Sequence, residues 1–373
     1  METKNETRVV VGAGAVAPPG PPEPRRDEAP LAVVRGLAEL HFVRRDVAGF
    51  GAFLEDFGLL PAATEGRRRS YRGTWAGPAC VTVAEGARDG FAGTTFLVAS
   101  ADEVETLAAG LGLQAERYGG GLAVSLTDPA GTRVRVAAGL DGHAARDERP
   151  ALRFNFGHRG ARHNRTQRPP RAAAEVQRLG HVVLETTRFR AMLDWYRHTL
   201  GMIVSDFLYL DDLPERGPVM AFLRCDRGDE PTDHHTLALH LGMACGLSHA
   251  AFQVTDLDAI AAGGEHLAAQ GHRRVWGIGR HILGSQLFDY WRGPAGDLFE
   301  HYADGDLFDA SVPPGWEPMY ASGLSQWGPP VNRDFLGTQL RPSLLAKACR
   351  ALADRDNDVD LAAARGLIKA MGS

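Results

Sequence analysis

A pattern of one strand, one helix and several short strands occurs four times along this chain of 373 residues. Apolar spacing predicts the four helices over residues 47–57, 102–111, 190–200 and 257–270, each after a strand rich in apolar residues. The copies recur about every 55 to 65 residues, which is typical of internal duplication. The sequence therefore predicts an α+β fold with two domains, each built from two paired βαβββ modules.

Changes in composition divide the chain into predicted segments. They are a flexible N-terminal arm over residues 1–30, a first module pair over 31–142, an Arg-rich linker over 143–176, a second module pair over 177–306 and a C-terminal appendage over 307–373. In the arm, Gly12 and Gly14 imitate the glycine fingerprint of dinucleotide-binding folds. The prolines from Pro18 onwards forbid the helix that such a fingerprint must open. We interpret the linker as a solvated connection that docks on acidic surface.

Composition excludes several classes of partner. The formal net charge of −5 provides no basic field for nucleic acid or for an anionic membrane. No apolar run approaches the roughly 20 residues that span a bilayer, and the first residues lack the pattern of a secretory signal. The four cysteines have no paired spacing, which indicates reduced thiols. We expect a cytoplasmic protein that binds neither nucleic acid nor membrane.

The segment 279–306 carries an unusual number of polar side chains for a hairpin. Strands are predicted over residues 286–291 and 297–302, and the Gly-Pro-Ala-Gly sequence between them supplies the turn. Because side chains alternate along a strand, Leu298, Glu300 and Tyr302 share one face. A carboxylate on an inward face must be paired, protonated or bound to a metal, because an isolated buried charge costs several kcal/mol.

Two histidines upstream are candidate partners for Glu300. His181 in RLGHVVLET and His249 in LSHAAFQVTD stand at equivalent points of two similar apolar strands. Two imidazoles and one carboxylate on separate strands form a facial triad, which leaves open positions on a non-haem Fe(II). Taken singly, each histidine would more often be an ordinary core or surface residue.

The first module pair lacks this set of ligands. Alignment of the repeated strands places Glu39, Gly93 and Arg135 at the three ligand positions. Glycine has no ligand atom, and arginine keeps its proton at any ordinary pH. We therefore expect the first half to be a scaffold without metal, in which His41 is a core histidine.

Six motifs in a fixed order carry a family resemblance: LGH, DHHTLAL, LSHAAF, GRH, FDY and FEHYADGD. From about residue 176 to 306, and more weakly back to about residue 35, the chain resembles the type I extradiol ring-cleavage dioxygenases of the vicinal oxygen chelate superfamily. This group includes dihydroxybiphenyl, catechol and dihydroxycumate dioxygenases. The resemblance implies Fe(II) held by His181, His249 and Glu300, with a catechol and O2 as substrates. It also implies meta cleavage of the ring to a semialdehyde or keto acid, and a homo-oligomer.

The resemblance assigns roles to residues around the metal. His235 matches the acid–base histidine beside the dioxygen position, whereas strand alternation predicts that His234 points to the opposite face. The spacing to His249 is one residue shorter than the family pattern, which leaves the choice between His234 and His235 open. His281 and Tyr290 match the pair that hydrogen-bonds the catechol oxygens.

Two other functions stay open on the same fold. One is a glyoxalase- or epimerase-type lyase or isomerase, in which the metal acts as a Lewis acid. The other is a ligand-sequestering protein of the bleomycin-resistance kind, which needs no aligned metal ligands. The choice between Fe and Mn, the identity of the catechol and the bond that is cleaved also stay open.

Overall fold

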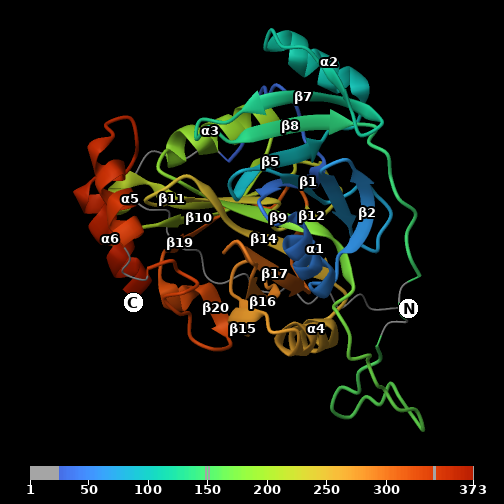
Figure 1. Ribbon diagram of the computed structural model, residues 1–373. Coiled ribbons are helices and arrows are strands. Elements are labelled where there is room, and N and C mark those ends of the chain that lie inside the picture. Colours follow the sequence, from blue (N-terminus) through green and yellow to red (C-terminus); the bar gives the residue numbers. More distant parts are fainter. Residues whose placement is uncertain (1–24, 148, 150–151, 339–341, 373) are drawn as a thin grey trace, which may run out of the picture.

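The computed structural model describes residues 25–147, 149, 152–338 and 342–372. Gly12, Gly14 and the prolines that follow them lie outside the described residues, as does most of the predicted arm. Two large mixed sheets, of eight and ten strands, dominate the structure, and helices α2 and α4 lie at opposite ends of the molecule (Figure 1). In the described part of the chain, no helix is both long and apolar enough to cross a membrane.

The first sheet has the strand order β2-β3-β4-β1-β5-β8-β7-β6. Its strands are β1 Gly36–Arg44, β2 Leu60–Glu65, β3 Arg68–Arg72, β4 Val81–Glu85, β5 Gly90–Leu97, β6 Glu116–Tyr118, β7 Gly121–Thr127 and β8 Arg133–Ala138. Helix α1, Val47–Asp56, follows β1, and helix α2, Ala101–Gly110, follows β5.

The second sheet has the order β19-β10-β11-β13-β9-β14-β17-β16-β15-β20. Its strands are β9 Val176–Thr186, β10 Ile203–Tyr209, β11 Pro218–Arg224, β13 Leu237–Leu241, β14 Gly246–Val254, β15 Arg273–His281, β16 Leu287–Arg292, β17 Leu298–Ala303, β19 Gly315–Pro318 and β20 Ser325–Trp327. A separate small sheet pairs β12 Thr232–Asp233 with β18 Leu307–Phe308. The helices are α3 Phe189–Leu200, α4 Leu257–Ala269, α5 Pro342–Ala353 and α6 Leu361–Gly372.

The two sheets repeat one arrangement. In the first, β1 pairs parallel with β4 and antiparallel with β5, and in the second, β9 pairs parallel with β13 and antiparallel with β14. Each half therefore joins two strand-helix-strand modules through their first strands. This confirms the α+β fold predicted from the four repeats.

Local sequence signals set the ends of the repeated helices. The side chains of Asp46 and Asp256 accept hydrogen bonds from Gly49 N and Ala259 N, which are free donors of the first turns of α1 and α4. Helix α3 ends at Gly201, whose φ of 63° is the left-handed conformation that glycine adopts without strain. These caps explain why the predicted and observed helices differ by only a residue or two.

The first half supports the back of the strand that carries Glu300. Phe299, next to Glu300 on β17, packs against Phe53 and Phe57 of the first half, with ring centroids 5.2 and 5.7 Å apart. On the same side, Nε2 of His301 donates to the backbone carbonyl of Phe57 at 2.7 Å. Full burial of each aromatic ring contributes roughly 1.5–3 kcal/mol. Because neighbouring side chains alternate, this packing directs Glu300 to the other face of the sheet, as the sequence predicted.

The C-terminal segment completes the second sheet at both edges. Strand β19 pairs in parallel with β10, and β20 pairs with β15 next to His281. The segment is therefore part of the sheet that contains the candidate ligands.

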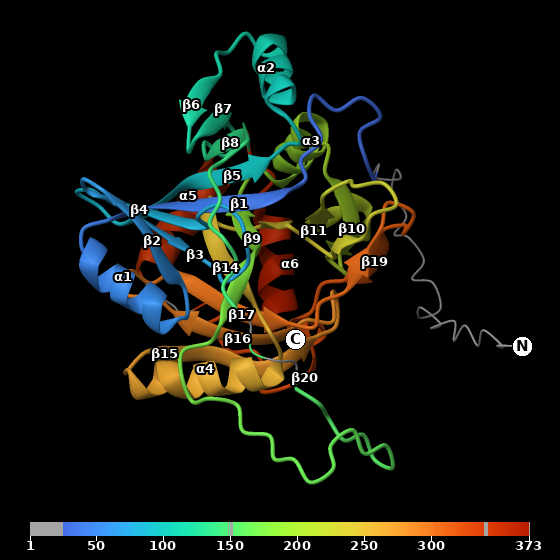
Figure 2. The same ribbon diagram turned by 90° about the vertical axis from the view of Figure 1, so that its right-hand side faces the viewer.

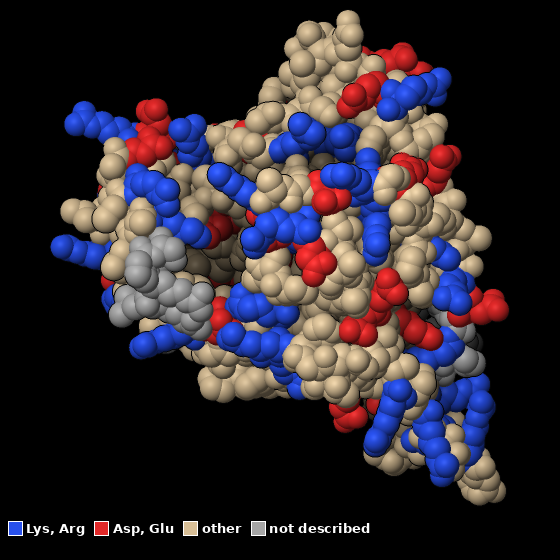
Figure 3. Space-filling view, in the orientation of Figure 1, with Lys and Arg blue, Asp and Glu red and all other residues tan. Residues whose placement is uncertain are grey.

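The Arg-rich segment between the halves projects from the body of the molecule, as the long loop below the sheets in Figure 2 shows. Residues 152–171 contain six Arg and no Asp or Glu. Figure 3 shows basic side chains gathered on this projection. Phe154 and Phe156 lie on it with their rings 6.2 Å apart, and Phe156 is 70% exposed.

Candidate metal centre

Three side chains from three adjacent strands meet inside the second sheet. Ligand atoms of His181 on β9, His249 on β14 and Glu300 on β17 all lie within 4.8 Å of one another, and all three residues are buried. The strand register explains this, because Ala251 of β14 is paired with His181 on one side and with Glu300 on the other. Residues paired in this way have their side chains on the same face of the sheet. Nε2 of His181 is 3.3 Å and Nε2 of His249 is 3.4 Å from the same carboxylate oxygen, Oε2 of Glu300.

The hydrogen-bonding state of this cluster fits a bound cation. Both carboxylate oxygens of Glu300 and Nδ1 of His181 are buried without a hydrogen bond to any described residue. A fully buried carboxylate with no hydrogen bond is strongly unfavourable unless an ion completes its environment. Two imidazole nitrogens and one carboxylate are the donor set that suits non-haem Fe(II) and leaves positions open for other ligands.

The ionisation of the cluster also fits metal binding. Burial lowers the pKa of His181 against the opposing effect of Glu300, so the imidazole stays neutral and keeps a lone pair. Burial alone would raise the pKa of Glu300, but the imidazoles of His181 and His249 beside it hold it well below its usual range. The pair of states, neutral imidazole and ionised carboxylate, is the one that binds a metal ion.

His281 and Tyr290 form a hydrogen-bonded pair at one side of the cluster. Nδ1 of His281 lies 2.7 Å from the carbonyl oxygen of Leu324, which can only accept, so Nδ1 carries the proton. In the neutral ring Nε2 then accepts from the hydroxyl of Tyr290 at 2.9 Å. The same Nε2 is 3.6 Å from Oε1 of Glu300. Burial and the charge of Glu300 raise the pKa of Tyr290 well above its usual value, so its hydroxyl stays protonated.

His235 lies against the first ligand. Its ring centroid is 4.0 Å from that of His181, and the residue is buried. Burial, with the neighbouring histidines, lowers the pKa of His235 well below its usual value, so the ring is neutral near pH 7. The structure thus brings together the six residues singled out in the sequence: His181, His235, His249, His281, Tyr290 and Glu300.

The predicted orientation of His234 is wrong. Its Nδ1 lies 3.0 Å from Nδ1 of His235, and both side chains are buried, so the two imidazoles meet instead of facing opposite sides. The reason is that the chain bends between β12 and β13, where both histidines lie. The two-residue alternation of an extended strand does not apply to that bend.

The sequence placed a second tyrosine, Tyr302, on the face of Glu300, but sequence reasoning gave it no role in the site. The ring of Tyr302 lies 5.3 Å from that of His181, and its buried hydroxyl has no hydrogen bond to a described residue. The signal was present, because Tyr302 follows Glu300 by two positions on β17 and so shares its face. The Leu324 carbonyl was also missed, and a backbone atom gives no signal in the sequence.

The first half has a polar network at the equivalent place. The β1, β5 and β8 register puts Glu39, Gly93 and Arg135 where the alignment predicted. The hydroxyl of Tyr118 donates to Glu39 at 2.5 Å, and His41 bonds the hydroxyl of Thr95 at 2.7 Å. These groups are satisfied by one another, unlike the carboxylate of Glu300 in the second half.

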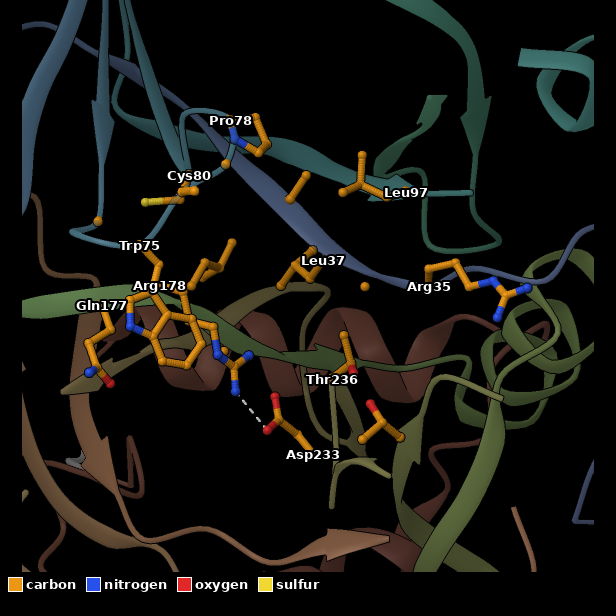
Figure 4. A pocket seen from close by; sticks show the side chains of 18 of the residues that line it. Arg35, Leu37, Trp75, Pro78, Cys80, Leu97, Gln177, Arg178, Asp233 and Thr236 are labelled. Atoms are coloured by element: carbon orange, nitrogen blue, oxygen red, sulfur yellow. Dashed lines mark hydrogen bonds and ion pairs between the residues drawn. The ribbon is translucent and has the colours of Figure 1, made fainter. Parts of the chain in front are cut away.

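A pocket of about 390 Å³ opens between the two halves, next to the segment that carries the two histidines. Figure 4 shows Arg178, Trp75 and Asp233 around it, with Arg178 and Asp233 joined by an ion pair of 2.7 Å. Strand β1 lines one wall and strand β9 the other. Metal ligands are absent from its lining, so this pocket and the metal cluster are separate features of the described structure.

Comparisons with known proteins agree with this geometry. Residues 178–300 match the family model described as Glyoxalase/Bleomycin resistance protein/Dioxygenase superfamily. Metapyrocatechase 2 of Cupriavidus necator is 34% identical over 221 residues, which cover 59% of this chain and 65% of the relative. An iron-dependent extradiol dioxygenase of Rhodococcus jostii (strain RHA1) is 26% identical over 159 residues, covering 41% of this chain and 50% of that protein. The chain therefore spans less than two thirds of the length of either relative.

Solved structures share the fold. The Mn(II)-bound glyoxalase from Novosphingobium aromaticivorans superposes with a TM-score of 0.67 at 21% identity, covering 84% of this chain and 97% of the other. An extradiol ring-cleaving dioxygenase from B. fuscum gives 0.66 at 20% identity, covering 84% of both chains. These structures therefore share the fold of this chain, and residues 178–300 resemble the glyoxalase, bleomycin resistance protein and dioxygenase superfamily.

Proposed function

We propose that this protein is an Fe(II)-dependent extradiol dioxygenase. Its reaction inserts both atoms of O2 into a substituted catechol and opens the ring beside the hydroxyl pair, giving a semialdehyde or keto acid. The observation that carries the proposal is the buried His181, His249 and Glu300 cluster, flanked by an acid–base histidine and a histidine–tyrosine pair. The two curated relatives, a metapyrocatechase and an iron-dependent extradiol dioxygenase, support it.

His181, His249 and Glu300 would hold the iron, which suits their neutral and anionic states. Bound there, Fe(II) supplies a redox-active Lewis acid that lowers the pKa of a catechol hydroxyl and gathers both reactants at adjacent positions. The first half, over residues 31–142, serves as the scaffold behind β17. The second half, over residues 177–306, performs the chemistry.

His281 and Tyr290 would orient the catechol. The Leu324 carbonyl fixes the proton of His281 on Nδ1, so Nε2 presents a lone pair toward the site. When a catechol enters, that lone pair can exchange the hydroxyl of Tyr290 for a catechol hydroxyl as its donor, which frees the phenol of Tyr290 to donate to the other catechol oxygen. Together they hold two neighbouring oxygens in defined positions, which removes much of the orientational cost of the reaction.

His235 would handle protons on the side of His181. Its neutral imidazole can take a proton and later return it, a task that typically contributes 10²–10⁴-fold to a rate. His235 is preferred to His234 because its ring lies 4.0 Å from that of the candidate ligand His181, whereas the nearest groups to the ring nitrogens of His234 are His235 and Asp206.

The decisive experiment uses protein purified without oxygen and loaded with Fe(II), with Mn(II) and Zn(II) forms beside it. Mixed with a panel of substituted catechols in air, the Fe(II) form should consume O2 and release a yellow ring-opened product. An iron-replete sample that consumes no O2 with any catechol would overturn the proposal. Oxygen-independent activity of the Zn(II) form would favour a Lewis-acid lyase or isomerase. Tight ligand binding that ignores the metal would favour a sequestering protein.

We also propose that the protein works in the cytoplasm. We propose further that it forms a homo-oligomer, which the Arg-rich segment over residues 152–171 helps to hold together. Its six Arg belong to a chain with 41 Lys and Arg against 46 Asp and Glu, so the rest of the molecule is distinctly acidic. A second copy offers the complementary charge. Sedimentation at low and high salt tests the proposed oligomer. Dissociation at high salt, or after these Arg are replaced by Gln, would support the proposal. A mass that stays the same under all these conditions would contradict it.

A further inference from the structure

Three side chains form a buried line that ends at His235. Nδ1 of His235 lies 3.0 Å from Nδ1 of His234, and Nε2 of His234 lies 2.5 Å from Oδ2 of Asp206. His234 is 1% exposed, His235 4% and Asp206 9%. These hydrogen bonds link strand β10 to the ring of His235, which lies against the candidate metal ligand His181.

The chemistry of the end groups decides the direction of both hydrogen bonds. An ionised carboxylate can only accept, so Nε2 of His234 carries the proton that it donates to Asp206. In a neutral imidazole the other nitrogen, Nδ1 of His234, is then an acceptor. Nδ1 of His235 must therefore carry a proton and donate it. This leaves Nε2 of His235 as a lone pair, and it makes no hydrogen bond to any described residue.

The surroundings hold both supporting residues in place. Asp206 lies opposite Gly315 of β19, and a Cβ at Gly315 would come within 2.0 Å of Oδ1 of Asp206. A side chain at position 315 would therefore have to displace this carboxylate. The backbone of His234 is fixed at both ends, because its carbonyl accepts from the hydroxyl of Ser205 at 2.5 Å and its N–H donates to the carbonyl of Asp306 at 2.9 Å.

We propose that Asp206 and His234 are positioning residues that hold His235 in the tautomer protonated on Nδ1, with the lone pair of Nε2 turned away from His234 and available to the reaction. The proposal rests on the proposed function, because it assigns the origin of the acid–base state of His235. The same logic operates in a Ser-His-Asp triad, where the carboxylate fixes the tautomer of the histidine and Asp→Asn leaves the geometry intact but reverses that tautomer.

The first test reads the tautomer directly and needs no activity. Metal-free protein labelled with ¹⁵N in histidine is examined by long-range ¹H–¹⁵N NMR, and His235 is assigned by the loss of its signals in His235→Gln. The expected result is a protonated Nδ1 and an unprotonated Nε2 on His235. In Asp206→Asn, which preserves size, the tautomer should reverse. A wild-type His235 protonated on Nε2, or an unchanged tautomer in Asp206→Asn, overturns the proposal.

The second test separates positioning from stability in the iron-loaded enzyme. Asp206→Asn should lower kcat by roughly 10²-fold while KM changes by less than about threefold, because a uniform loss of binding would appear in KM instead. The matched control is Asp226→Asn, which removes another carboxylate that faces Arg224 but bonds neither histidine. Equal losses in both variants would contradict the proposal. If wild-type protein cleaves no catechol, the proposed function fails, and the NMR result still decides the tautomer.

Discussion

Nδ1 of His281 donates to the backbone carbonyl of Leu324 across 2.7 Å, which ties the C-terminal segment to the centre of the site. Leu324 ends a short 3₁₀ helix, η2 Ala321–Leu324, immediately before β20. The contact selects the tautomer of His281 and so determines that Nε2, beside Tyr290 and Glu300, is an acceptor.

Deletion of Gly323 should reduce activity without releasing iron. The shortened segment moves the Leu324 carbonyl away from His281, and loss of such a supporting hydrogen bond costs about 10–100-fold. The matched control is Gly323→Ala, because an added Cβ there meets nothing nearer than Tyr320 at 3.9 Å. Steady-state kinetics and iron content measure both effects. Equal activity of the deletion and the alanine variant would show that the carbonyl has no role.

Glu300→Gln should abolish iron binding and turnover while the fold persists. The substitution removes the only carboxylate of the ligand cluster, and the strand pairing of β17 does not depend on that charge. Glu39→Gln is the matched control, since Glu39 occupies the equivalent position of the first half. Iron per chain, measured after anaerobic loading, distinguishes them. If the Glu39 variant lost iron and the Glu300 variant kept it, the metal site would lie in the first half of the chain, which would contradict this assignment.

His235→Gln should leave iron bound and slow the reaction by about 10²–10⁴-fold, the usual contribution of a positioned acid–base group. The metal ligands are untouched, so the iron content should match that of the wild type. Single-turnover oxygen uptake with a bound catechol measures the slow step. His240→Gln is the control, because His240 hydrogen-bonds the carbonyl of Leu241 and is not one of the three residues of the ligand cluster. A normal rate in His235→Gln would remove the residue from the mechanism.

The sequence was sufficient for the parts of the fold and site that obey local rules. Asp46, Asp256 and Gly201 mark helix ends by capping, and alternation along β17 correctly placed Glu300 inward. The three candidate ligands converge because the strands that carry them pair in one register. Alignment of the repeated strands in the sequence already placed the three residues at corresponding positions.

What the sequence could not provide depends on long-range contacts or on irregular chain. The bend after β12 turns His234 toward His235, and no periodic pattern describes a bend. Asp206 lies inside a mostly apolar strand, and its partner His234 is 28 positions away. The Leu324 contact joins a backbone oxygen to a residue 43 positions earlier, so its effect on His281 emerges only when β20 pairs with β15.

Gly93→His should destabilise the first half and create no metal site there. Gly93 has a φ of 130°, and an added Cβ would come within 2.1 Å of the carbonyl oxygen of Arg133. Forcing a side chain into such a conformation costs about 1–3 kcal/mol before the clash is counted. Gly36→Ala is the control, because an added Cβ there meets nothing within 4 Å. Urea unfolding gives the comparison, and an unchanged midpoint for Gly93→His would contradict this account of why a ligand is missing.

Because of His41, the free energy of unfolding of the protein should decrease as the pH is lowered. Burial, together with the charges of Arg135, Arg68 and Arg133, lowers the pKa of His41 to about 3, whereas in the unfolded chain it is near 6.5. The unfolded state therefore binds a proton that the folded state excludes. Below pH 6.5 this linkage removes up to about 1.4 kcal/mol per pH unit, until the pH reaches about 3.

The His41→Gln variant isolates this contribution from that of its neighbours. Glu39, whose pKa burial raises, acts with the opposite sign, but it is present in both proteins and so cancels to first order in their comparison. Urea unfolding from pH 8 to pH 5 should show the wild type losing free energy of unfolding more steeply than the variant, with the curves parallel above pH 7. Parallel curves over the whole range would mean that His41 is protonated in the folded protein, and that the network around Glu39, Tyr118 and Arg135 is more open to water than its hydrogen bonds indicate.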